Sequence, residues 1–245
     1  MPYKDRVLTI QGDSHELPSA PQYLVLPVDA ASINPQYLTD QTCIIDFSES
    51  YDFSTPPQEL GTPLSYCAPE IIFHNPAGPA SDIWALACTL FEIRSGQLLV
   101  HAGFGDEDDA LLQMVQLFGK LPEPWWSSWE KRDIWFNEEG VPDKLYHDGK
   151  PSARRYTLEG ILAEGYHYTY FAKGIFSGEE GEKKSFTIPT DEIKDLVDLL
   201  GQMFKYQPNE RITVAAVATH PWLQVCRKSS TLTEEQERIT PLTTT

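Results

Sequence analysis

The segment from Ile83 to Ile93 constrains the fold of this 245-residue chain more than any other feature. It is apolar on nearly every face of a helix, and Ser81 and Asp82 supply a cap and a negative first turn where such a helix would begin. Gly96 suits the C-terminal end of that helix. Because a helix without a polar face cannot lie on a surface, we expect this one to be buried centrally in a packed core.

Further helices and two short strands are expected elsewhere in the chain. Carboxylates favour a helix start near Asp106–Asp109, and residues 190–192 and Thr213 cap two more helices. Apolar, β-branched runs at 23–26 and 42–45 predict the strands. The sequence therefore predicts a mainly α fold with a few short strands.

The remaining segments lack clear periodicity. Residues 1–40 are punctuated by proline and are expected to be irregular, whereas residues 48–66 are rich in Ser, Thr and Pro and form a long loop. The charged run 178–184 is expected to be a solvated loop, and residues 224–245 a mobile tail. The tryptophans between 125 and 135 are interpreted as core side chains.

The charge balance excludes some classes of partner. The chain has 19 Lys and Arg residues against 36 Asp and Glu, and its formal net charge is −17. Nucleic-acid binding needs a dense basic face, so we expect none, and the acidic surface favours basic partners instead. The chain has no apolar run long enough to span a membrane and no signal peptide at its N-terminus, so no membrane partner is expected.

The cysteines indicate a reducing compartment. None of the four forms a Cys-x-x-Cys pair, so a zinc site or redox motif is not expected. Cys43 and Cys88 lie in apolar runs and are interpreted as core thiols. We therefore expect the chain to be cytoplasmic or nuclear.

Short motifs follow one another in an informative order. Asp46-Phe47-Ser48 follows the strand expected at 42–45, and Ala68-Pro69-Glu70 closes the long loop after it. The apolar helix with Asp82 at its start comes next, and two C-terminal motifs contain Arg211 and His220. A strand, an Asp-Phe pair, a loop and an Ala-Pro-Glu have the order of a protein-kinase activation segment.

The chain therefore resembles the C-terminal lobe of a eukaryotic serine/threonine protein kinase. Within that family it is most similar to the kinases of Arg/Ser-rich splicing factors, on residues that include Asp82-Ile83-Trp84 and Leu117-Phe118-Gly119-Lys120-Leu121-Pro122. The resemblance implies a kinase-like large lobe over residues 41–223. It also implies that Glu70 and Arg211 form a structural ion pair.

The same resemblance implies an acidic docking region for basic, Arg/Ser-rich proteins or peptides. Its carboxylates are those of Asp106, Glu107, Asp108 and Asp109. A solvated helix N-terminus explains this acidic run equally well.

The sequence departs from the family where catalysis is performed. It contains no G-x-G-x-x-G, no His-x-Asp motif precedes Asp46, and the first 45 residues hold Lys4 as their one lysine. The third position of the Asp-Phe-Gly motif is Ser48. No catalytic set is complete, so we expect no phosphoryl transfer and no cofactor, although the family uses ATP and Mg²⁺.

Several alternatives stay open at this point. Asp46 is either a vestigial metal ligand or an ordinary Asp at a strand end, and Asp82 either has the family's role or caps its helix. The chain is either a non-catalytic binding module or part of an active kinase whose upstream half lies outside it. A hydrolase using His74, His101 or His220 has no nucleophile motif in its favour. With no small lobe to cover it, the apolar face of the lobe is expected to favour self-association.

Overall fold

A computed structural model describes most of the chain between residues 41 and 224, together with two short strands before it. The described residues are 4–6, 23–25, 41, 43–52, 54–55, 57, 60–102, 106–143, 155–170 and 182–224. They belong to two compact units, one of residues 46–166 and 185–245 and the other of residues 1–45 and 167–184. The predicted boundaries at 40 and 223 stay predictions, and the expected tail from 225 onward lies outside the described residues.

Two small sheets account for the described strands. In the first, β1 (Lys4–Arg6) pairs antiparallel with β2 (Tyr23–Val25), which confirms the strand expected at 23–26 for residues 23–25. The expectation that residues 1–40 are irregular is wrong for residues 4–6, which find a strand partner in β2. In the second, β3 (Tyr166–Tyr170) lies beside β4 (Glu182–Phe186). The expectation of a solvated loop at 178–184 is therefore wrong for residues 182–184. Pairing with β3 satisfies backbone groups there, which the charged side chains gave no reason to expect.

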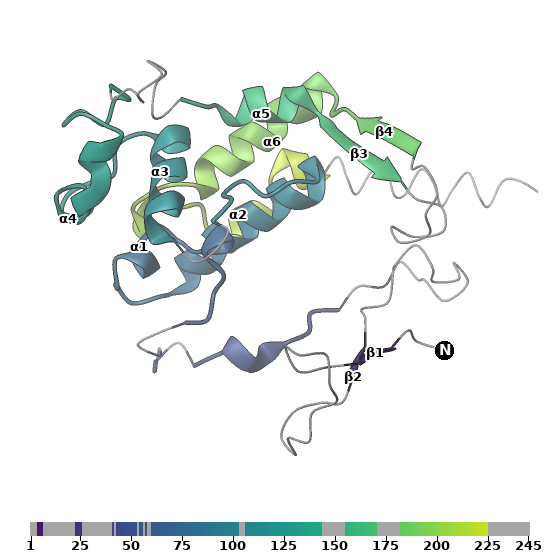
Figure 1. Ribbon diagram of the computed structural model, residues 1–245, viewed down its shortest axis with the longest axis horizontal. Coiled ribbons are helices and arrows are strands. Elements are labelled where there is room, and N and C mark those ends of the chain that lie inside the picture. Colours follow the sequence, from purple (N-terminus) through teal and green to yellow (C-terminus); the bar gives the residue numbers. More distant parts are fainter. Residues whose placement is uncertain are drawn as a thin grey trace, which may run out of the picture. The chain divides into compact units, whose positions relative to one another are not determined.

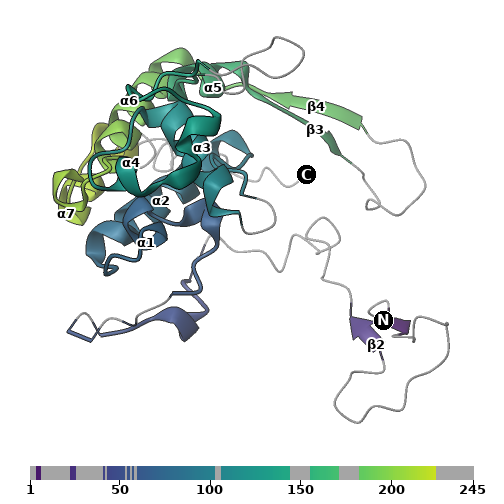
Figure 2. The ribbon, with the colours of Figure 1, turned by 60° about the vertical axis from the view of Figure 1, so that its left-hand side comes forward.

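The larger unit is built around α2 (Pro79–Ser95), the helix with the apolar sequence. It lies alongside α6 (Thr190–Met203), which also contacts α5 (Leu158–Glu164) (Figures 1 and 2). The predicted mainly α fold is confirmed. The other helices are α1 (Pro69–Ile72), α3 (Glu107–Phe118), α4 (Trp125–Ser128) and α7 (Val214–Ala218), with 3-10 turns η3 (Phe47–Glu49), η4 (Leu64–Tyr66), η5 (Glu130–Ile134) and η6 (Pro208–Glu210).

The start of α2 differs from the prediction. The helix begins at Pro79, whose fixed φ suits the first helical position, and Gly78 is its N-cap. Ser81 lies in the first turn, where its hydroxyl accepts a hydrogen bond of 3.2 Å from the Gly78 N–H. The alternative in which Asp82 caps the helix is therefore wrong, whereas the negative first turn expected from Asp82 is present. The C-terminal prediction is confirmed, because Gly96 has a φ of 73° and its N–H donates to the Glu92 carbonyl at 2.7 Å.

The predicted caps of α3 and α7 are confirmed, whereas that of α6 is wrong. Asp106 caps α3 by accepting from the Asp108 N–H at 2.9 Å, and the Thr213 hydroxyl caps α7 by accepting from the Ala216 N–H at 3.3 Å. The N-cap of α6 is Pro189 and not residue 190, so that helix begins without a side-chain cap. Its start is stabilised instead by Asp191 and Glu192 in the first turn.

The core contains the predicted aromatic cluster. Trp125, Trp126 and Trp129 are buried, and the Trp125 ring stacks on Phe73 with centroids 5.4 Å apart. The interpretation as core is therefore confirmed for these three tryptophans, and Trp135 packs against the core while partly exposed. The same holds for Cys88, which is buried in α2. No helix among the described residues is long and apolar enough to cross a membrane.

The strand expected at 42–45 is wrong for its described residues. Residues 43–45 form no strand, Cys43 is exposed and not a core thiol, and Ile44 and Ile45 are 83% and 76% exposed. A strand needs a partner to pair its backbone groups. Among the described residues nothing pairs with this segment, so its β-branched composition does not produce a strand.

One face of α2 is not covered by the described residues. Asp82 and Ile93 are exposed, and Leu86 and Leu90, which lie between them on the same face at helical spacing, are only half-buried.

We expect this face of α2 to bind a hydrophobic dye and to make the chain associate as its concentration rises. Ile93→Lys should weaken both effects. Sedimentation measures the association. Val214→Lys, at an exposed apolar residue of α7, is the matched control. A chain that stays monomeric at high concentration and binds no dye contradicts this prediction.

Candidate functional site

Asp46 opens the segment that resembles a kinase activation segment. Its φ of 62° lies in the left-handed region, and its carboxylate accepts a hydrogen bond of 2.7 Å from the Ser48 hydroxyl. Both residues are exposed, as is Phe47. The serine that replaces the family's glycine therefore binds the one side chain expected to hold a metal.

A metal role for Asp46 would need further ligands beside it. A magnesium–nucleotide site needs oxygen ligands arranged together with donors for the phosphates. Among the described residues, no group of three or more His, Cys, Asp or Glu side chains is placed to hold a metal. The Asp46 carboxylate is engaged by the Ser48 hydroxyl.

The end of the segment is fixed by the pair of Glu70 and Arg211. The Arg211 guanidinium donates two parallel hydrogen bonds to the two Glu70 carboxylate oxygens, at 2.7 and 2.6 Å. Glu70 is 2% exposed and lies in α1, directly after Ala68 and Pro69, both of which are buried. The contact predicted from the resemblance is present, although 141 positions separate the two residues. Two-pronged geometry of this kind suits Arg and not Lys.

Other groups complete the burial of this ion pair. Arg211 also donates to the carbonyls of Ala80, Lys205 and Tyr206, and its guanidinium lies 5.1 Å from the centroid of the Trp84 ring. The Ser81 hydroxyl donates to Glu70 at 2.8 Å. Sequence reasoning interpreted Ser81 only as a cap. Its hydrogen bond to Glu70 joins α1 to the first turn of α2.

Asp82 does not contact this ion pair in the described structure. It is exposed in the first turn of α2, and partial desolvation raises the pKa of its carboxyl. Burial raises the pKa of the Tyr51 hydroxyl, and the negative charge of Asp82 raises it further. Tyr51, from the loop after Asp46, therefore lies close enough to Asp82 for the two side chains to interact electrostatically.

The acidic start of α3 is divided between paired and exposed carboxylates. Asp106, Glu107 and Asp109 are exposed. Asp108 is less exposed, because one carboxylate oxygen accepts from the Trp129 ring N–H at 2.7 Å and the other from the Lys131 ammonium. We call these four carboxylates, Asp106 to Asp109, the acidic helix end. Its three exposed carboxylates fit both interpretations given above, a solvated helix N-terminus and a docking region for basic peptides.

Lys131 shows that the acidic helix end holds a cation. The hydrogen bond with Asp108, followed by the charge of Asp108, raises the pKa of the Lys131 ammonium. Asp106 and Asp109 contribute smaller effects in the same direction. Sequence reasoning missed this contact, because residues 119–143 have no periodicity that would bring η5 to α3. The charge pattern alone offered no signal for it.

The fold and the buried ion pair at the end of the segment define a protein kinase lobe, and comparison with known proteins agrees. Residues 37–223 match the protein kinase domain family, which is more than half of the chain. The chain belongs to the protein kinase family.

The related proteins include kinases of the SR-protein group. Serine/threonine-protein kinase SKY1 of Saccharomyces cerevisiae is 26% identical over 163 residues, covering 65% of this chain and 19% of that protein. Serine/threonine-protein kinase SRPK of Physarum polycephalum is 28% identical over 163 residues, which cover 64% of this chain and 32% of that protein. SRSF protein kinase 3 of Mus musculus is 28% identical over 162 residues, which cover 64% of this chain and 24% of that protein. The resemblance predicted from the sequence is confirmed. The chain spans between about a fifth and a third of the length of these relatives.

Proposed function

We propose that these 245 residues act as a non-catalytic module that binds basic, Arg/Ser-rich proteins or peptides. The observation that carries the proposal is the acidic helix end, where Lys131 of the same chain already occupies Asp108 while Asp106, Glu107 and Asp109 stay exposed. A basic peptide would place its cations on those three carboxylates. The net charge of −17 would attract such a peptide from a distance.

The non-catalytic part of the proposal is supported by the segment around Asp46. Ser48 engages the Asp46 carboxylate, and these 245 residues contain no glycine-rich loop and no His-x-Asp motif ahead of it. Phosphoryl transfer depends on positioning and charge neutralisation by several groups together. In this proposal Asp46 is a remnant of a metal site, and the chain uses neither ATP nor Mg²⁺. The cytoplasm or nucleus is its proposed location, in keeping with the free thiols of Cys43, Cys67 and Cys88.

A second candidate function is part of an active kinase that transfers the ATP γ-phosphate to Arg/Ser-rich proteins. Family membership and the partial coverage of the relatives favour it. In that case the phosphate-binding groups would come from sequence outside these 245 residues. The two candidates share the peptide-binding step and differ in whether this chain alone transfers phosphate.

Neutralising the exposed part of the acidic helix end is expected to weaken peptide binding roughly tenfold, because each exposed charge contributes a few tenths to 1 kcal/mol. The variant combines Asp106→Asn, Glu107→Gln and Asp109→Asn. It keeps Asp108, which holds Trp129, and Asn at position 106 still caps α3. Calorimetric titration with an Arg-Ser repeat peptide measures the affinity. Binding should weaken further as salt rises, since screening acts over about 8 Å at physiological ionic strength.

A matched control changes the net charge equally at other exposed carboxylates. It combines Glu159→Gln, Asp191→Asn and Glu210→Gln, and we expect it to retain most of the affinity. If both triple variants lose the same affinity, only the overall charge attracts the peptide. If neither does, the acidic helix end is a solvated helix start and the proposal fails.

A further inference from the structure

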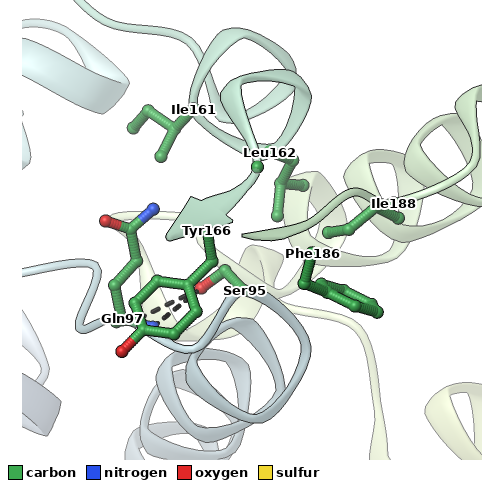
Figure 3. A pocket seen from close by; sticks show the side chains of 8 residues that line it. Ser95, Gln97, Ile161, Leu162, Tyr166, Phe186 and Ile188 are labelled. Carbon is green, nitrogen blue, oxygen red and sulfur yellow. Dashed lines mark hydrogen bonds between the residues drawn. The ribbon is translucent and has the colours of Figure 1, made fainter. Parts of the chain in front are cut away.

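A cavity of about 370 Å³ opens between the segment after α2, α3 and α5. Its apolar lining includes Phe91 and Leu99, which are buried in the core, together with Leu117 and Ile161. Sites for bound molecules are typically of this size and have such a lining. The adjoining hollow in Figure 3, which shares Gln97 and Ile161, leaves no volume for a water molecule and is packed core.

The walls of this cavity are held in place before any ligand arrives. On one side the Gln113 side chain of α3 ties down the segment after α2, accepting from the His101 N–H at 2.8 Å and donating to the His101 carbonyl at 3.2 Å. On the other side the Tyr156 N–H donates to the Gln116 carbonyl at 3.1 Å. Both walls are therefore fixed to α3. A ligand would not have to order them, which lowers the cost of binding.

Two side-chain amides at the cavity have no hydrogen bond to any described residue. They belong to Gln97 and Gln116, and both line the cavity. In Figure 3 the Gln97 amide extends toward Ile161, which lines the same cavity. A primary amide offers two donors and an acceptor, so it can pair with a peptide group in both directions. Gln113 and Gln116 are three residues apart on a helix, a spacing that places them on one face.

We propose that this cavity binds an extended, uncharged peptide segment of a partner, with one apolar side chain against the half-buried Leu117 and Ile161 and its backbone held by Gln97 and Gln116. The charge of the lining favours this class of ligand over a basic side chain. Among the described lining residues Glu164 is the one carboxylate, and it lies at an exposed position. A guanidinium placed in the cavity would lose hydration without a matching pair of acids.

The inference rests on the proposed binding function and deepens it. The acidic helix end would hold the basic part of a partner, and the cavity would add an uncharged segment with an apolar residue. Specificity would then depend on two features of the partner. Each can be removed separately, because the cavity residues and the exposed carboxylates of the acidic helix end are different side chains.

The experiment titrates the full chain with Gly/Ser peptides of about nine residues that carry a central Leu, Gly or Arg. NMR follows the side-chain amide signals of Gln97 and Gln116. We expect the Leu peptide to shift both signals to saturation and to bind at least about tenfold more tightly than the Gly peptide. Gln97→Ala and Gln116→Ala should each weaken the Leu peptide roughly fivefold. Gln202→Ala on α6, whose amide donates to Asp198, is the control and should change nothing.

Two results overturn the inference: equal binding of the Leu and Gly peptides, or tightest binding of the Arg peptide at these signals. A parallel titration with the Arg-Ser repeat peptide separates this inference from the proposed function. If that peptide binds while the Leu peptide does not, the cavity inference fails and the proposed function stands. If the Arg-Ser peptide does not bind, the proposed function fails whatever happens at the cavity.

Discussion

Arg211→Ala is expected to lower the free energy of unfolding by about 3–5 kcal/mol, because it leaves the buried Glu70 carboxylate without its partner. Ser81 would still donate to Glu70, but a single hydroxyl cannot replace two charged hydrogen bonds. Three backbone carbonyls, those of Ala80, Lys205 and Tyr206, would also lose their donor. Glu70→Ala should be similarly costly, because it leaves the guanidinium buried and unpaired. Urea unfolding measures both values.

The double variant distinguishes a coupled pair from two independent losses. With both partners removed no unpaired charge stays buried, so the double variant should cost clearly less than the sum of the single variants. Arg211→Lys should recover only part of the stability, since an ammonium cannot form the two parallel bonds. Lys205→Ala, at an exposed neighbouring position, is the control. Small and additive effects of the two single variants would contradict the role given to this pair.

Trp84→Ala is expected to cost about 3–5 kcal/mol, the second large effect. Trp84 is 1% exposed and lies in the middle of an aromatic cluster, with ring centroids 5.6 Å from Phe118 and 5.0 Å from Phe204. Its ring also faces the Arg211 guanidinium. Removing the indole therefore opens a cavity and weakens the surroundings of the ion pair.

Trp84→Phe should be much milder than Trp84→Ala. The indole N–H is buried and makes no hydrogen bond to any described residue, so a phenyl ring loses volume and no hydrogen bond. Urea unfolding of both variants, with Ile93→Ala at an exposed position of α2 as the control, measures the difference. An equal loss for Phe and Ala would mean that ring volume is not what stabilises this site.

Local sequence was sufficient to predict helix ends whose capping groups lie close in the chain. The acidic start of α3, the Thr213 cap of α7 and the left-handed Gly96 after α2 all follow from residues close in the chain. The pair of Glu70 and Arg211 is different. Nothing local brings the two residues together, and only the resemblance to kinases predicted their contact.

The wrong or missed predictions have the opposite cause, because each depends on a contact with a segment distant in the sequence. Residues 43–45 have the composition of a strand but no described strand to pair with, so they form no strand and are exposed. Residues 182–184 look like a solvated loop but pair with β3. Lys131 reaches Asp108 only because η5 packs near α3, a tertiary contact that charge patterns do not reveal.

The most direct test of the non-catalytic proposal is phosphate transfer from labelled ATP to an Arg-Ser repeat peptide, measured on this chain with Mg²⁺ present and the peptide at saturation. The predicted result is no label above background for either the chain or its Asp46→Ala variant, while the peptide still binds. Transfer that is present in the chain and abolished by Asp46→Ala would contradict the account, because Asp46 would then hold a working metal in spite of Ser48.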